Sequence, residues 1–85
     1  MKYPIKEGTK VFHGSPGYEN KEVISCVTFH YCAMRGHMYE IAFENGCFTY
    51  LPQEDFQTLT QDGEVQFNRG SGFRAIESIF VDKSA

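Results

Sequence analysis

Residues that form turns recur at short intervals along the chain, and this spacing restricts the fold more than any other feature. The turn-forming runs are Gly8, residues 14–17, Arg35-Gly36, Asn45-Gly46, Asp62-Gly63 and residues 70–72. The segments between them are rich in β-branched and aromatic residues, with five Tyr and eight Phe in 85 residues. Short segments of this composition, bounded by turns, are typical of β-strands. The sequence therefore predicts an all-β, or mostly β, antiparallel protein.

The expected elements follow from these boundaries. We expect strands over residues 9–13, 22–32, 37–44 and 47–51, a single helical turn over 52–56 and a short strand over 57–59. Residues 64–67 and 73–81 are expected to form a C-terminal hairpin around 68–72. The last segment leaves an alternative open, because Phe73, Ile76 and Phe80 would also share one face of a helix. A chain of this length forms one domain, residues 1–85, with 8–59 as the main unit and 60–85 packed on it.

The turn at Asn45-Gly46 sets the expected register of the two strands that it joins. As a two-residue turn, in which both positions take positive φ, it places Phe43 opposite Phe48 and Ile41 opposite Tyr50. One face of the sheet would then carry a continuous apolar set. Its members are Tyr39, Ile41, Phe43, Phe48 and Tyr50.

The preceding turn should agree with this face, because a slip of one residue inverts every side chain. A three-residue loop over 34–36 pairs Tyr31 with Tyr39 and gives Gly36 the left-handed position that such loops need. Three apolar residues are left on the opposite, solvent side: Ile24, Met38 and Leu51. An exposed apolar strip favours self-association, so a dimer or higher oligomer is expected.

Charge is distributed unevenly, and this restricts the partners. Between Gly36 and Asn68 the chain has no Lys or Arg. The same stretch carries six acidic residues: Glu40, Glu44, Glu54, Asp55, Asp62 and Glu64. Nucleic-acid binding usually requires a basic stripe, so that function is not expected. The acidic stretch is either a solvated surface or a face for a basic protein partner.

Cysteines and histidines offer little chemistry at these spacings. The odd count of Cys26, Cys32 and Cys47 favours reduced thiols and a cytoplasmic protein. In a strand rising about 3.3 Å per residue, Cys26 and Cys32 lie too far apart to bind one zinc ion. A thiol or metal site that uses His30 and Cys32 remains as a minor hypothesis. No phosphate loop, dinucleotide motif or Ser-His-Asp arrangement is present, so neither a cofactor nor an enzymatic activity is expected.

The order of strands and turns resembles a small SH3-like barrel of the Tudor and KOW type. The resemblance covers residues 8–59 and is carried by Gly8-Thr9-Lys10-Val11, by 22–27 and above all by 38–56, MYEIAFENGCFTYLPQEDF. It implies a small barrel with a helical turn near 52–56. Tudor-type domains bind methylated Lys or Arg in an aromatic cage. The resemblance therefore implies a cage from Tyr18, Phe43 and Phe48, with Glu44 supplying charge.

These observations favour a non-enzymatic binding module that recognises a protein segment, with a basic partner. The alternative is a small phage- or bacterium-encoded inhibitor or sequestering protein. No apolar run reaches the about 18 residues that span a membrane, and the first eight residues lack the hydrophobic region of a signal peptide. Tyr31, Tyr39 and Tyr50 would cluster at one end of the core face, where their hydroxyls can reach water or a partner, and Tyr18 lies in the first loop. With the acidic residues and the turn beside them, the expected ligand-binding residues are Tyr18, Tyr31, Tyr39, Glu40, Glu44, Asn45 and Tyr50.

Overall fold

The computed structural model describes residues 2–34, 36–68 and 76–84, and it is mostly β with one helix. The elements, in chain order, are β1 (Lys10–Gly14), β2 (Asn20–Cys32), β3 (Gly36–Phe43), β4 (Phe48–Pro52), α1 (Gln53–Asp62), β5 (Glu64–Asn68) and β6 (Ile76–Val81). The strands form one antiparallel sheet in the order β4-β3-β2-β1-β6-β5. The mostly β, antiparallel prediction is confirmed. The sheet does not close into a barrel, because β4 and β5 end it without pairing with each other.

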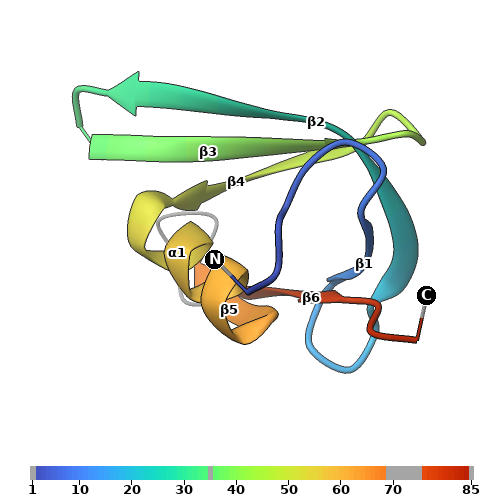
Figure 1. The fold of residues 1–85 in the computed structure, drawn as a ribbon. Coiled ribbons are helices and arrows are strands. Elements are labelled where there is room, and N and C mark those ends of the chain that lie inside the picture. Colours follow the sequence, from blue (N-terminus) through green and yellow to red (C-terminus); the bar gives the residue numbers. More distant parts are fainter. Residues whose placement is uncertain (1, 35, 69–75, 85) are drawn as a thin grey trace.

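The long strand β2 connects two layers. Figure 1 shows it running along β3 in the upper layer and then curving down toward β1 and β6 in the lower one. The pairing is irregular between Ile24 and Cys26, where Ser25 forms a β-bulge. Bulges bend a strand and increase its twist, which lets β2 turn from one layer into the other. The core lies between the layers and is closed by α1.

The bulge also reverses the expected face of Ile24. Before the bulge Ile24 pairs with Phe43, and after it Val27 pairs with Ile41, so all four side chains face the core. Ile24 is fully buried. A bulge adds one residue to one strand only, so it inverts the alternation on that strand alone.

The β3–β4 register differs from the prediction by one residue, and the two-residue turn is wrong. Among the described residues only glycines have positive φ, so Asn45 cannot take its place in such a turn. Instead, Gly46 N–H donates to the Phe43 carbonyl and Phe43 N–H to the Cys47 carbonyl, which makes a three-residue loop. Only Gly46, with φ of 93°, is left-handed.

This slip exchanges the two faces of β4. Leu51 now lies opposite Tyr39 and is fully buried, whereas Phe48 lies opposite Ala42 and is 45% exposed. Tyr50 lies on the same outer face as Phe48. Because Ile24, Met38 and Leu51 are all buried, the apolar strip that motivated the oligomer prediction does not exist.

The β2–β3 loop has the expected length but is displaced by one residue. Cys32 pairs with Gly36, so three residues separate the strands, and Gly36 has the expected left-handed φ of 78°. Tyr31 therefore pairs with His37 rather than with Tyr39, and each partner moves by two residues. A shift of two residues leaves every side chain on the same face of the sheet as predicted. Arg35 of the predicted loop lies outside the described residues.

The helix α1 is longer than the single turn expected over 52–56, and the strand expected over 57–59 is wrong. Phe56, Leu59 and Thr60 are buried at the i, i+3, i+4 spacing of one helix face. Glu54 and Asp55 in the first turn favour this helix through its dipole. It ends at Gly63, whose φ is 81° and whose N–H donates to the Leu59 carbonyl. Within the described parts of the chain, no helix is long and apolar enough to cross a membrane.

The C-terminal hairpin is present, and its second strand is central to the sheet. Strand β6 pairs with β5 on one side and with β1 on the other. The strand alternative for the last segment is therefore confirmed over Ile76–Val81. The expected turn at 69–72 and residues 73–75 lie outside the described residues.

Candidate functional site

The tyrosines of the β2–β3 hairpin lie on the side of the sheet that faces α1. The Tyr39 ring stacks on Phe56 of α1 at 3.8 Å between centroids and meets the edge of Phe29 at 4.8 Å. Tyr31 lies beyond them, 71% exposed, with its ring 5.3 Å from His37. Of the two, Tyr31 is the one exposed to a partner, because Tyr39 is held between the sheet and the helix.

Glu40 and Tyr50 lie on the opposite, outer face. The Glu40 carboxylate contacts His30 Nε2 at 2.9 Å, and the His30 ring lies 6.0 Å from Tyr50. Tyr50 in turn meets the edge of Phe48 at 5.6 Å. The structure therefore brings Glu40 and Tyr50 together through His30. It places them across the sheet from Tyr31 and Tyr39.

The other three predicted residues belong to two loops. Asn45 is engaged within its own turn: its Oδ1 accepts from Cys47 N–H at 2.9 Å, and its Nδ2 donates to Glu22 at 3.1 Å. Glu44 is exposed beside it. Tyr18 is 80% exposed in the β1–β2 loop.

The cage that the Tudor resemblance implies would need two phenylalanine rings on one surface. Phe43 is 2% exposed and faces the core, whereas Phe48 faces outward from the other side of the sheet. The two rings therefore do not line one cavity.

His30 and the thiols are not assembled into a site by the described residues. His30 is already paired with Glu40, and Cys26 and Cys47 are free and exposed. The Cys32 side chain lies outside what the structure describes. Within the described residues, no group of three or more His, Cys, Asp or Glu side chains is arranged to hold a metal ion.

A partly buried polar cluster lies at the edge of the core. His13 of β1 contacts the Glu77 carboxylate of β6 through Nε2, and the fully buried Thr49 hydroxyl of β4 donates to the same carboxylate at 2.9 Å. The His13 ring stacks on Phe43 at 5.0 Å. The Glu77 side chain thus links its own strand β6 to its neighbour β1 and to the distant edge strand β4. Thr49 is fully buried, so its hydroxyl is not exposed to a substrate from solvent, and its hydrogen bond to Glu77 satisfies a polar group at the core.

The six acidic residues of the region 36–68 do not form one face. Glu40 is on the outer face with His30, Glu44 is in the β3–β4 turn, and Glu54 and Asp55 are in the first turn of α1. Burial, with a smaller contribution from Glu54, raises the pKa of Asp55. Asp62 and Glu64 remain, at the end of α1 and the start of β5, and they help to line a groove.

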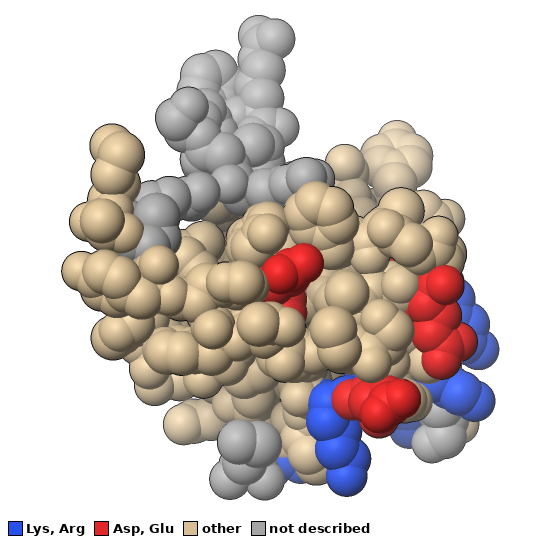
Figure 2. Space-filling model, turned by 90° about the horizontal axis from the view of Figure 1, so that it is seen from above, with Lys and Arg blue, Asp and Glu red and all other residues tan. Residues whose placement is uncertain are grey.

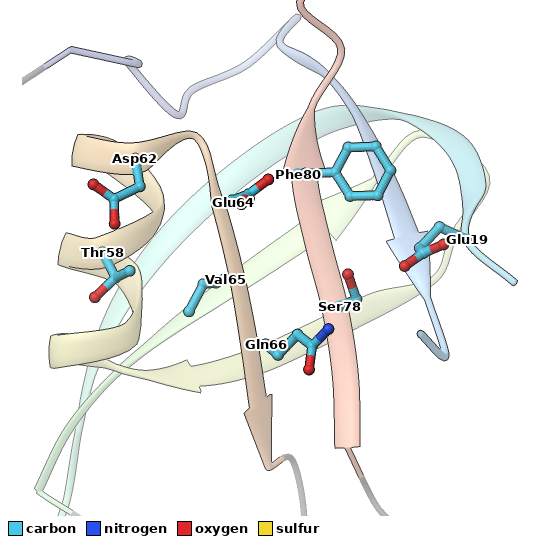
Figure 3. Close-up of a pocket in the computed structure, with 8 residues that line it drawn as sticks. All are labelled: Glu19, Thr58, Asp62, Glu64, Val65, Gln66, Ser78 and Phe80. Carbon is cyan, nitrogen blue, oxygen red and sulfur yellow. The ribbon is translucent and has the colours of Figure 1, made fainter. Parts of the chain in front are cut away.

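This acidic groove, of about 500 Å³, lies over β5 and β6 beside α1. In Figure 3 its lining runs from Thr58 and Asp62 on the helix, across the two strands, to Glu19 from the loop before β2. The register pairs Glu64 with Phe80 and Gln66 with Ser78, which places these four side chains on one face of the hairpin. The full lining is Glu19, Thr58, Asp62, Glu64, Val65, Gln66, Ser78 and Phe80.

The groove carries three carboxylates and no basic side chain among its lining residues. Glu19 is held in its charged form, because hydrogen bonds from its own main-chain N–H and from the Ser78 side chain lower its pKa. Phe80 supplies apolar surface on the same face as Glu64, whereas Val65, which pairs with Ile79 and packs against the core, reaches the groove only at its edge beside α1. Chemically, this arrangement suits a long cationic side chain, whose alkyl stem can lie on apolar surface while its charge meets a carboxylate.

Comparison with protein-family models, with curated proteins and with solved structures finds no match for the chain. The candidate site is therefore defined by geometry and charge alone.

Sequence reasoning identified Asp62 and Glu64 as acidic but did not join them to Glu19 and Ser78. Glu19 comes from the β1–β2 loop and Ser78 from β6, so only the pairing of β6 with β1 brings them to the groove. The alternation of Glu64 and Gln66 along β5 was the one available local signal.

Proposed function

We propose that the chain is a non-enzymatic binding module that recognises a basic protein segment, and that the acidic groove receives Lys or Arg side chains of that segment. The observation that carries the proposal is the convergence of Glu19, Asp62 and Glu64 from three separate elements on one groove without a basic neighbour in its lining. A purely solvated surface would not require that convergence. Six acidic residues of the region 36–68 motivated the predicted preference for a basic partner, and two of them, Asp62 and Glu64, line the groove.

Recognition would depend on charge for encounter and on the groove floor for retention. Three like charges in one hollow attract a cationic segment at a distance, and salt screens this attraction over about 8–10 Å. After encounter, the alkyl stem of a Lys or Arg would lie along Phe80, which shares its face of the hairpin with Glu64. Each exposed ion pair should contribute about 0.5–1 kcal/mol, which is about two- to fivefold in Kd.

The test uses a labelled peptide of alternating Lys and Ser as the probe, with a Glu-Ser peptide as the charge control. Its association rate should fall steeply as salt rises from about 50 to about 500 mM, since exposed charges act mainly on encounter. Glu64→Gln and Asp62→Asn should each weaken binding about two- to fivefold. Glu54→Gln is the matched control, because Glu54 lies on the same helix but outside the groove.

Two outcomes would contradict the proposal. One is equal binding of the Lys-Ser and Glu-Ser peptides. The other is loss of binding in Glu54→Gln, or in Glu40→Lys and Glu44→Lys, while the two groove variants bind as the wild type does. Loss in Glu40→Lys and Glu44→Lys would move the basic-partner site to the outer face and the β3–β4 turn, and loss in Glu54→Gln would move it to the first turn of α1.

A further inference from the structure

Strand β2 extends well beyond its pairing with β1. The β1 ladder covers only Asn20 to Val23 of β2, and Gly8 and Thr9 extend the contact to Ile24. The β3 ladder continues to Cys32. From Cys26 to Cys32, β2 therefore pairs on one side only with the residues that the structure describes. Its other side is an open edge, which we call the β2 edge (residues 26–32).

The main-chain groups on the β2 edge can be identified from the ladder. Phe43 N–H donates to the Cys47 carbonyl, so Phe43 directs its main-chain groups toward β4. Main-chain groups alternate in direction along a strand, so Ala42 and Glu40 direct theirs toward β2. Their partners on β2, Cys26 and Thr28, direct theirs toward β3. The residues between them direct their N–H and C=O groups outward, to the open side. These residues are Val27, Phe29 and Tyr31.

The β2 edge lacks the features that normally protect such a strand. Residues 25–34 contain no charge, no Pro and no Gly. Phe29 and Tyr31 are 48% and 71% exposed beside the open groups. Figure 2 shows the same character from above: apart from the grey atoms, the side nearest the β2–β3 turn shows neither Lys and Arg nor Asp and Glu. Unpaired main-chain groups on a strand are satisfied best by another strand.

We propose that the β2 edge pairs, antiparallel, with the β2 edge of a second copy of this chain, about a two-fold axis at Phe29. This register places Phe29 opposite Phe29 of the second copy and Val27 opposite Tyr31. All the outward main-chain groups then meet each other, which gives about six hydrogen bonds between the chains. The result is one continuous sheet through both molecules, distinct from the acidic groove.

A second copy fits this edge for three reasons. The strand is uncharged, so bringing two copies together opposes no like charges within the edge. In this register, residues whose side chains lie on the same face of the sheet stand opposite each other, so the exposed aromatic side chains continue on one face through both copies. Tyr31 then pairs with the β-branched Val27, a favourable cross-strand combination. Finally, an isologous contact uses both open edges at once and closes, whereas pairing with a different edge would propagate into a filament.

Hydrogen exchange at two protein concentrations tests the pairing residue by residue. In the dimer, the amides of Val27, Phe29 and Tyr31 should become protected as concentration rises from low to high micromolar, while those of Thr28 and His30 stay protected throughout by β3. Sedimentation should show a monomer–dimer equilibrium over the same range. A strict monomer with fast-exchanging edge amides at both concentrations would overturn the proposal, and so would edge protection that appears only when a foreign peptide is added.

Variants separate this edge from any other contact. Phe29→Lys places two charges face to face at the axis and should weaken the dimer about tenfold or more. Tyr31→Pro removes an outward N–H that no described residue accepts a hydrogen bond from, and it should also abolish pairing. This second variant covers the case in which Phe29→Lys fails to fold. Tyr18→Lys, at an equally exposed tyrosine outside β2, is the control. A dimer that both edge variants leave intact, or one that grows into filaments, would contradict the two-fold contact.

Discussion

Truncating Leu51 and Phe48 in turn measures which face of β4 is in the core. Leu51 is fully buried among the core residues, whereas Phe48 is 45% exposed on the outer face. Removing a buried leucine side chain costs about 2–5 kcal/mol, because the lost transfer energy adds to the cost of the cavity. Removing a half-exposed phenylalanine side chain forfeits about half of the 1.5–3 kcal/mol of full burial, or about 1 kcal/mol.

These magnitudes are large against the total stability. A domain of 85 residues should have a free energy of unfolding of about 4–13 kcal/mol. Leu51→Ala should therefore lower the urea midpoint strongly, and Phe48→Ala should lower it by about a third as much, with the m-value unchanged in both. The opposite order of costs would refute the three-residue loop, because a two-residue turn exchanges the positions of the two side chains.

Three further predictions concern single residues. Gly36→Val should cost about 1–3 kcal/mol in unfolding free energy, because φ is 78° and a β-branched residue is strained there, although no atom crowds its Cβ position; an unchanged denaturation midpoint would contradict this. Thr49→Val should cost about 1–3 kcal/mol by removing the hydroxyl that donates to Glu77, and Thr49→Ser should recover most of the loss in the same assay. Hydrogen bonds from Ser84 lower the pKa of Asp82, so its ionised form stabilises the fold above the unfolded pKa of 3.8. Stability curves of Asp82→Asn and wild type should therefore differ at neutral pH and converge as pH falls through the folded pKa; a constant difference would contradict the linkage.

Features that depend on residues close together in the sequence were predictable, and the positions of the strands are an example. Turn residues bounded the strands to within a few positions, and Gly36 was correctly expected in the left-handed region. The Asn45-Gly46 pair was ambiguous, since the same two residues suit a two-residue turn or a three-residue loop with Gly46 in the left-handed position. The choice depended on Leu51 fitting the core better than Tyr50, which is a tertiary property.

Other features depended on contacts that no local pattern records. The bulge at Ser25 has no Gly to mark it, yet it decides that Ile24 is buried. The β-branched Thr58 and Thr60 around Leu59 favoured a strand, but the burial of Leu59 on a helix face prevailed. The predicted binding residues were separated for the same reason, because the shifted β4 register sent Tyr50 to the opposite side of the sheet from Tyr39.

Mapping amide chemical shifts during titration with the Lys-Ser peptide tests the central claim most directly, because it locates the contact as well as detecting it. If the acidic groove binds the cationic segment, the largest shifts should fall on Glu64, Gln66, Ser78 and Phe80, and added salt should reverse them. Shifts confined to Glu40, Glu44 and the β3–β4 turn, or shifts that salt leaves unchanged, would contradict the account.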